Sequence, residues 1–290
     1  MTIAQLAVFL KVVETGSFTR AAQALNMTQP AVSHAITGLE SGLGVTLFIR
    51  DRAKGLILTD AGNRILVHAR GILNLVERIR QEATAETGLE KGTIRIGSFP
   101  SVSAHFLPRI IGEFRRRHPR IEIVWLEGTY QEVEEWIQSR VVDLGIIVLP
   151  NESLDVIPLA RDQMKVLLPP GHTLGRERAI RMEQLDGEPL ILARGYETPI
   201  LSLFEQSGIR LRIEFQVINT RTILKMVEEG LGLAILGQLA LPGDLPKLQV
   251  CDLEPPFWRH FGLACLKFQE ASPAVQLFIR IAQDLFREKP

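Results

Sequence analysis

Residues 16–36 read GSFTRAAQALNMTQPAVSHAI, and this stretch decides the fold of the amino-terminal part of the chain. Ser17 and Thr28 stand where hydroxyl side chains cap the first turn of a helix, and apolar residues follow each at helical spacing. Asn26 lies between the two patterns and tolerates the left-handed backbone conformation that ends a helix. Pro30 falls in the first turn of the second helix, where it costs no hydrogen bond. The stretch therefore predicts two short helices joined by a tight turn.

The second predicted helix has one apolar face and one polar face. Val32 and Ile36 recur at the spacing of a buried stripe. Gln29, Ser33 and Thr37 fall on the opposite side, and uncharged donors and acceptors of this kind suit the edges of base pairs in the major groove. We interpret the pair as a helix-turn-helix that reads DNA; a solvated amphipathic hairpin inside a larger domain is the alternative.

The residues after this helix add a second DNA-binding feature. The pattern from Ile49 to Thr59 predicts a two-stranded wing, and Arg50, Arg52 and Lys54 lie near its tip, where their charges suit phosphates. Residues 17–62 as a whole resemble the amino-terminal module of the LysR-type transcriptional regulators. The motifs that carry this resemblance are Ser17, Leu39-Glu40, Leu43-Gly44, Leu47-Phe48, Arg50 and Leu58-Thr59-Asp60-Ala61-Gly62.

The resemblance implies that this module binds a double-stranded DNA operator. Gln29 and Ser33 are expected to read bases, with Pro30 against a thymine methyl group. His34 stands where the family more usually has arginine, so the half-site preference at that point is not carried over. The expected DNA-binding residues are Arg20, Thr28, Gln29, Pro30, Ser33, His34, Thr37, Arg50, Arg52 and Lys54.

A repeated apolar pattern from residue 65 to residue 83 predicts how the chain assembles. Its members are spaced alternately by four and three residues, which is typical of a helix paired with a copy of itself. A helix that packs on its own domain is the alternative. In the family that the chain resembles, this linker helix forms the dimer contact. The expected dimerisation residues are Ile65, Ala69, Ile72, Val76, Ile79 and Ala83.

The charge balance also favours assembly. The 33 Lys and Arg residues equal the 33 Asp and Glu residues, so the chain as a whole has no basic field that would hold nucleic acid. The part before Thr59 has five basic and three acidic residues, a surplus of two. Because phosphate contacts supply much of the affinity for DNA, one copy is expected to bind weakly. A homodimer or a homotetramer is the expected DNA-binding form.

From residue 93 onward the sequence alternates patterns typical of strands and helices. Short, continuous apolar runs predict parallel strands covered on both faces. Strands are expected at 93–97, 121–126 and 144–148, then near 164–168, 189–192, 213–217, 233–236 and 261–266, with a last helix at 274–286. Chain crossings expected around 160–162 and 266–269 would form a hinge between two lobes, with a cleft between them.

This region resembles the effector-binding domain of the same family, which is similar to periplasmic solute-binding proteins. The resemblance rests on motifs such as Leu107-Pro108, His118-Pro119, Asp143-Leu144-Gly145-Ile146 and Glu229-Gly230-Leu231-Gly232. The expected fold class is α/β multidomain: a winged helix-turn-helix, a long linker helix and a two-lobed α/β domain. The expected boundaries are 1–60, 61–90 and 91–290, with the first lobe at 91–160 and 267–290 and the second lobe at 161–266.

Several turns after the predicted strands open helices, and ligands of open α/β sheets bind at such turns. Free backbone N–H groups there suit a small organic or inorganic anion, and Arg194 is the one candidate for a cationic clamp. If Glu197 faces the cleft, it favours an amine or a hydroxyl on the ligand; plain helix capping is the alternative for each Ser and Thr. With the resemblance, the expected effector-binding residues are Ser98, Pro100, Ser101, Val102, Thr129, Val148, Tyr196, Glu197, Thr198, Asn219 and Thr220.

The sequence offers no sign of catalysis or of a resident cofactor. His105, His172 and His260 lack the spacing of metal ligands, and no Ser, His and Asp grouping surrounds a nucleophile turn. Cys251 and Cys265 are expected to be buried and unreactive, with redox sensing as the alternative. We therefore expect no metal, no cofactor and no enzymatic activity.

The expected function is sequence-specific regulation of transcription, in which an effector bound between the lobes changes the geometry of the DNA-bound oligomer. RNA polymerase is a further expected partner. With neither a secretory signal nor a membrane-length apolar run in the sequence, we expect a cytoplasmic protein with no membrane contact. The alternatives are a ligand-binding or enzymatic α/β domain that merely carries a helical module, and a nucleoid-like DNA binder.

Overall fold

The computed structural model describes residues 1–51, 55–85, 91–245 and 247–286, with positions 50, 51 and 85 described by their backbone alone. It divides into two compact units, which are described separately. One comprises Met1–Gly92 and Ser139–Val141, and the other comprises Thr93–Gln138 and Val142–Pro290. Among the described residues, no helix is both long enough and apolar enough to span a lipid bilayer.

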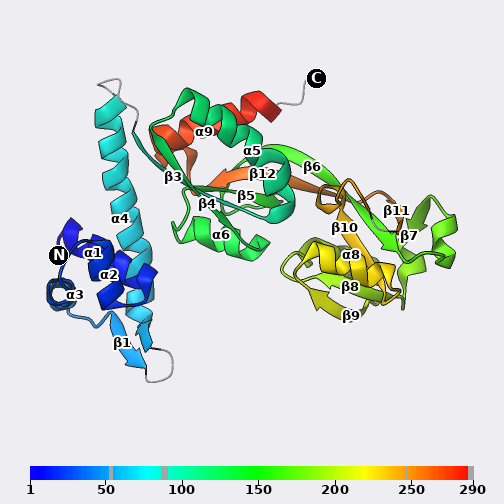
Figure 1. The fold of residues 1–290 in the computed structure, drawn as a ribbon, viewed down its shortest axis with the longest axis horizontal. Coiled ribbons are helices and arrows are strands. Elements are labelled where there is room, and N and C mark those ends of the chain that lie inside the picture. Colours follow the sequence, from blue (N-terminus) through cyan, green and yellow to red (C-terminus); the bar gives the residue numbers. More distant parts are fainter. Residues whose placement is uncertain (52–54, 86–90, 246, 287–290) are drawn as a thin grey trace. The chain divides into compact units, whose positions relative to one another are not determined.

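The first unit is built around the predicted helix-turn-helix (Figure 1). Its elements are α1 (Ile3–Thr15), α2 (Phe18–Ala24), α3 (Gln29–Leu43), β1 (Phe48–Asp51), β2 (Gly55–Leu58) and α4 (Asp60–Ala85). Ser17 caps α2 by accepting from the Arg20 backbone N–H at 3.4 Å, and Thr28 caps α3 in the same way. Asn26 has the left-handed φ of 52° that the turn needs. The predicted helix-turn-helix is confirmed.

A short-range contact fixes where the wing starts. The Glu40 carboxylate on α3 accepts from the backbone N–H of Leu47 at 2.7 Å and of Phe48 at 3.3 Å. Strands β1 and β2 then pair antiparallel. At Gly62 on α4, a Cβ atom would lie 2.4 Å from the Leu47 carbonyl oxygen, so only glycine allows this approach of helix and wing.

The second unit has two lobes. Lobe I contains β3 (Gly92–Ser98), α5 (Pro100–Arg117), β4 (Ile121–Glu127), α6 (Tyr130–Gln138), β5 (Leu144–Leu149), β12 (Trp258–Cys265), η4 (Phe268–Glu270) and α9 (Pro273–Phe286). Lobe II contains η1 (Thr173–Arg176), β7 (Ala179–Arg181), η2 (Met182–Leu185), β8 (Pro189–Ala193), α7 (Thr198–Ser207), β9 (Arg212–Val217), α8 (Thr220–Glu228), β10 (Leu233–Gly237), η3 (Gln238–Ala240) and β11 (Gln249–Glu254). The long strand β6 (Asp155–Leu168) runs through both lobes.

The strands of the second unit follow the order β4-β3-β5-β12-β6-β10-β8-β9, and off this path β11 pairs with β6 and β7. In lobe I, helices α5 and α9 cover one face of the strands and α6 covers the other (Figure 1). Pairing is parallel between β3 and β5 and between β8 and its neighbours, but β12 pairs antiparallel with both β5 and β6. The prediction of parallel strands is therefore wrong for the strands that cross between the lobes, because the chain crosses in one direction and returns in the other.

The first crossing lies close to its predicted place and the second does not. On β6, Leu159 belongs to the core of lobe I and Met164 to the core of lobe II. The return takes place along the first residues of β12, where Trp258 pairs with Gln163 and Phe261 with Ala160, and Phe261 and Cys265 already pack in the core of lobe I. The predictions of a crossing at 266–269 and of a second lobe extending to residue 266 are therefore wrong. A buried apolar run indicates a strand, but it does not indicate which sheet the strand joins.

Candidate functional site

Helix α3 presents a polar face over a buried apolar face. Val32, Ile36 and Leu39 pack in the core of the first unit. The side chains expected to contact DNA point outward: Thr28, Gln29, Pro30, His34 and Thr37 are exposed, and Ser33 is half-buried. Arg20 on α2 is exposed as well. Arg50 lies on β1, with its side chain undescribed, and Arg52 and Lys54 lie outside the described residues.

The apolar pattern on α4 serves two purposes along its length. Ala69 is buried in the core of the first unit, and Ile65 packs against that core. The prediction of a dimer contact is therefore wrong for Ala69, which is 1% exposed, and stays a prediction for the half-buried Ile65. Farther along, Ile72 and Ala83 are exposed, Ile79 is 65% exposed, and Val76 is half-buried. Leu75, which the heptad pattern does not include, is 54% exposed beside them.

A pocket of about 590 Å³ lies between the lobes of the second unit. Lobe I contributes Tyr130, Gln131, Glu134, Val148, Leu149 and Pro150, and lobe II contributes Thr198, Pro199, Ser202, Leu203 and Gln206. The returning chain adds Phe257, Trp258, Arg259 and His260. This volume is in the range of small-molecule sites, and the wall combines apolar surface with a few polar groups, as such sites do.

A buried ion pair lies at the wall of this pocket. Arg259 on β12 and Asp162 on β6 are 6% and 3% exposed. The guanidinium donates to Asp162 Oδ2 through Nη2 at 2.6 Å and through Nε at 3.0 Å. It also donates to the Tyr130 hydroxyl and, at 3.3 Å, to Ser101 Oγ. Asp162 Oδ1 accepts from the Leu239 backbone N–H at 3.0 Å, so the pair joins the starts of two lobe I helices to lobe II.

The lobes also meet beside this ion pair. The backbone N–H of Tyr130 donates to the carbonyl oxygen of Gly195 at 3.3 Å. Gly195 has a φ of +83°, and a Cβ atom there would lie 2.3 Å from Thr129 Cγ2. The Tyr196 ring contacts the Tyr130 ring edge-on, and its hydroxyl donates to the Gly128 carbonyl oxygen at 3.4 Å. Burial raises the pKa of Tyr130, and it raises the pKa of Tyr196 to about 12.

Val148 and Thr198 are the predicted effector residues that line the pocket. Ser98 and Val102 are fully buried instead. The Ser98 hydroxyl lies 2.6 Å from Ser103 Oγ and accepts from Trp125 Nε1, so it serves the packing of lobe I. The predicted pocket role of these two residues is therefore wrong, because the end of β3 directs Ser98 and the first turn of α5 directs Val102 into the core.

The other predicted effector residues lie at helix starts. Thr129 Oγ1 accepts from the Glu132 backbone N–H, and Asn219 Oδ1 accepts from the Thr222 backbone N–H, so both act as caps. Pro100 is exposed at the start of α5, and Thr220 is half-buried at the start of α8. Glu197 precedes α7, and its Oε2 is buried without a hydrogen-bond partner among the described residues. Arg194, the expected cationic clamp, is exposed and is not among the pocket residues.

The sequence interpretation missed Arg259 and Asp162. Each is a charged residue in a strand that also contains apolar residues, which is a weak signal of a buried pair. It could not indicate the partner, because the two residues are 97 positions apart. The cation of the pocket thus comes from the crossing strand, where no strand-to-helix turn would reveal it.

The two thiols are buried, as expected. Burial raises the pKa of Cys251, and it raises the pKa of Cys265 to about 12. A protonated, buried thiol is a poor nucleophile, which favours a packing role over redox sensing. Over the described ranges, no three His, Cys, Asp or Glu side chains lie close enough together to hold a metal ion.

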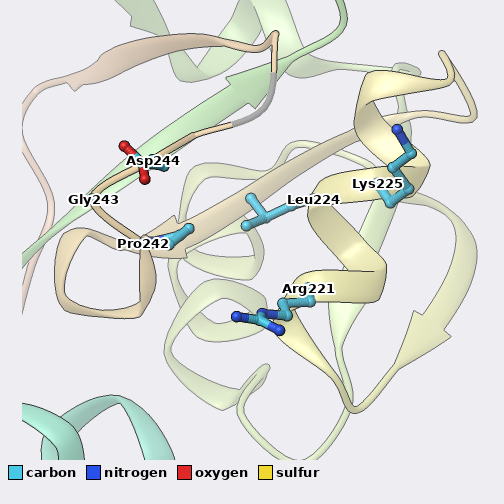
Figure 2. A pocket seen from close by; sticks show the side chains of 6 residues that line it. All are labelled: Arg221, Leu224, Lys225, Pro242, Gly243 and Asp244. Atoms are coloured by element: carbon cyan, nitrogen blue, oxygen red, sulfur yellow. The ribbon is translucent and has the colours of Figure 1, made fainter.

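A second pocket, of about 430 Å³, lies within lobe II. Figure 2 shows Arg221, Leu224 and Lys225 of α8 facing the loop that carries Pro242 and Asp244. Lys225 already pairs with Glu228 at 2.7 Å. Because all of its lining residues belong to one lobe, filling this pocket would not by itself change the angle between the lobes.

Comparison with known families decides the identity of the chain. Residues 3–63 match the model of bacterial regulatory helix-turn-helix proteins of the lysR family, and residues 87–287 match the model of the LysR substrate binding domain. The chain belongs to the LysR family of transcriptional regulators. It is a DNA-binding transcriptional regulator with an effector-binding domain, as the sequence predicts.

Individual relatives span the whole length of this LysR-type regulator. It is 49% identical over 289 residues to the uncharacterized HTH-type transcriptional regulator YvbU of Bacillus subtilis, and 99% of each chain is covered. The crystal structure of HinK, a LysR family regulator from Pseudomonas aeruginosa, is 29% identical and covers 98% of each chain with a TM-score of 0.60. A full-length OxyR variant from Pseudomonas aeruginosa, 23% identical, shares the fold with a TM-score of 0.76 over 99% of this chain and 98% of its own.

Proposed function

We propose that this LysR-type regulator binds a specific operator through the exposed face of α3. The observation that carries the proposal is the division of this helix between buried Val32 and Ile36 and outward-facing Gln29 and Thr37. Gln29 and Ser33 read base edges, and Pro30 contacts a thymine methyl group. Arg20, Arg50, Arg52 and Lys54 bind phosphates.

We propose further that the regulator works as a homodimer or a homotetramer. The exposed apolar side chains of Ile72, Leu75 and Ile79 form a stripe on one helix, and a contiguous stripe of this kind is typical of an interface. A dimer would offer two α3 helices to a site with two-fold symmetry. Its half-sites would be centred about one helical turn apart.

The inter-lobe pocket is the proposed effector site. A small molecule there would touch both lobes and the crossing strand, so its affinity would depend on the lobe angle, and by linkage it would shift that angle. We propose that the pocket binds its ligand without changing it chemically, and that the protein acts in the cytoplasm, where the DNA of a bacterium lies. RNA polymerase is a proposed further partner of the operator complex.

The experiment that tests DNA reading is selection of duplexes from a random pool by the purified full-length protein. The expected product is an inverted repeat whose half-sites are centred about one helical turn apart. Footprinting of the region beside the protein's own gene should then protect the same repeat. Recovery of unrelated duplexes with no shared motif would contradict sequence-specific binding.

A further inference from the structure

The Tyr130 hydroxyl, at the wall of the inter-lobe pocket, has a proton that is available to donate a hydrogen bond to a ligand. Its hydroxyl oxygen accepts from Arg259 Nη1, so its own O–H is left to donate. No acceptor for that proton is found among the residues that the structure describes. Burial raises the pKa of Tyr130, so the group remains a neutral donor at physiological pH.

Arg259 has an N–H group available as a hydrogen-bond donor next to the Tyr130 hydroxyl. Its Nε and Nη2 atoms are engaged by Asp162 and Ser101, whereas Nη1 makes one hydrogen bond, to Tyr130. A guanidinium Nη atom carries two N–H groups, so one N–H of Nη1 remains. Tyr130 and Arg259 both line the pocket, so two buried donors stand next to each other at its wall.

The charges around this pair limit what it can hold. Asp162 already neutralises the guanidinium, and the Glu134 carboxyl group also lines the pocket, where burial raises its pKa. A doubly charged group such as a phosphate monoester would face these carboxyl groups, and the described residues that line the pocket offer it no second buried cation. A carboxylate has two acceptor oxygens for two donors and a single charge.

The rest of the wall is mainly apolar. Val148, Pro199, Leu203, Phe257 and Trp258 provide surface on which a ring or an alkyl chain can pack. A ligand with one carboxylate and an apolar body would therefore use both parts of the pocket.

We propose that Tyr130 and Arg259 bind the carboxylate of a monocarboxylate effector whose apolar body packs against the inter-lobe wall. This inference rests on the proposed role of the pocket as the effector site. It places the anion on the crossing strand and the start of α6, rather than at the bare helix termini that the sequence suggested.

The test compares matched probes on the full-length protein. Benzoate and hexanoate carry one carboxylate, benzamide and hexanamide are their neutral counterparts, and phenyl phosphate carries the double charge. The chain has two tyrosines, so protein labelled with carbon-13 at tyrosine Cζ gives two signals, which Tyr196→Phe assigns. At least one carboxylate should shift the Tyr130 signal saturably, and its amide and phenyl phosphate should bind at least tenfold more weakly.

The substitution Tyr130→Phe removes the hydroxyl, which would donate to the carboxylate and which accepts from Arg259 Nη1. Because a hydrogen bond to a charged group is lost, carboxylate affinity by calorimetry should fall about tenfold, whereas Gln276→Ala, at an exposed residue of α9 outside the pocket, should leave it within about twofold. Equal affinities for acid and amide, no binding of either carboxylate, or an unchanged affinity in Tyr130→Phe would each overturn the assignment. The shift in wild-type protein decides the matter even if Tyr130→Phe folds poorly.

Operator binding, measured on the same preparation, separates this inference from the proposed function. If a carboxylate binds through Tyr130 and leaves the operator complex unchanged, the assignment of Tyr130 and Arg259 as carboxylate-binding residues is supported, and the proposed regulatory role of the pocket is wrong. If another class of ligand binds in the pocket and alters the operator complex, the regulatory role of the pocket is supported, and the assignment of Tyr130 and Arg259 as carboxylate-binding residues is wrong.

Discussion

Arg259 and Asp162 form an ion pair in the interior of the second unit although 97 positions separate them in the sequence. They lie on β12 and β6, the two strands that connect the lobes. At Gly237, a Cβ atom would lie 2.1 Å from Asp162 Oδ2 and 2.3 Å from Arg259 Nη2, so the surrounding backbone is shaped to this pair. The hinge of the effector-binding domain is thus organised around one buried positive charge and one buried negative charge.

Breaking this pair from one side should destabilise the second unit strongly. Asp162→Ala leaves a guanidinium buried without its counter-charge, which costs about 3 to 5 kcal/mol of unfolding free energy. Lys267→Ala removes an exposed partner of Asp155 and should cost at most about 1 kcal/mol. Urea unfolding followed by tryptophan fluorescence measures both, because all three tryptophans, Trp125, Trp136 and Trp258, lie in the second unit. Equal losses in the two variants would refute a special role for the buried pair.

Truncating the polar face of α3 should weaken specific DNA binding selectively. Gln29→Ala should cost about 1 to 3 kcal/mol on the selected operator, because a base contact is lost, and leave binding to a scrambled duplex unchanged. Gln276→Ala on α9 removes an exposed helical glutamine of the second unit and serves as the control. Fluorescence anisotropy at a fixed salt concentration measures all the affinities. A loss of the same size on the scrambled duplex would mean that Gln29 does not read bases.

The sequence predicted local structure better than the placement of distant segments. The caps at Ser17 and Thr28 and the left-handed Asn26 are decided by neighbouring residues, so helix and turn could be predicted together. The run from Phe261 to Cys265 was assigned to the wrong lobe, because its sheet is chosen by pairing with a strand more than a hundred residues earlier.

The candidate effector site shows the same limit. Most of the predicted effector residues stand at the starts of α5, α6, α7 and α8, but the direction of each side chain depends on packing. Ser98 therefore turned out to be a core residue and Arg259, on a strand, a pocket residue. A buried charge is recognisable only through its partner, and the partner is set by the tertiary fold.

Placing a charge on the exposed stripe of α4 should weaken dimerisation. Ile79→Glu would bury a carboxylate in each copy of the proposed interface and remove apolar surface, so the dimer dissociation constant should rise at least tenfold. Arg80→Gln changes the adjacent exposed residue and should leave it within about threefold. Sedimentation velocity over a concentration series measures both. Unchanged dimerisation in Ile79→Glu would remove this stripe from the interface.

The raised pKa of Cys265 predicts both its reactivity and its effect at high pH. With a pKa of about 12, the thiol stays protonated at pH 8, so Ellman's reagent should modify it slowly in the folded protein and rapidly in urea. The ordinary value for a thiol, 9.0, applies to the unfolded chain. Because folding raises the pKa, the contribution to stability is fully present below pH 9 and is lost as the pH rises toward 12. The unfolding free energy should therefore fall less steeply in Cys265→Ala than in the wild type over this range. If Ellman's reagent instead modified the folded wild type rapidly at pH 8 and did not do so in Cys265→Ala, Cys265 would be an accessible thiolate. Redox sensing would then be the better interpretation.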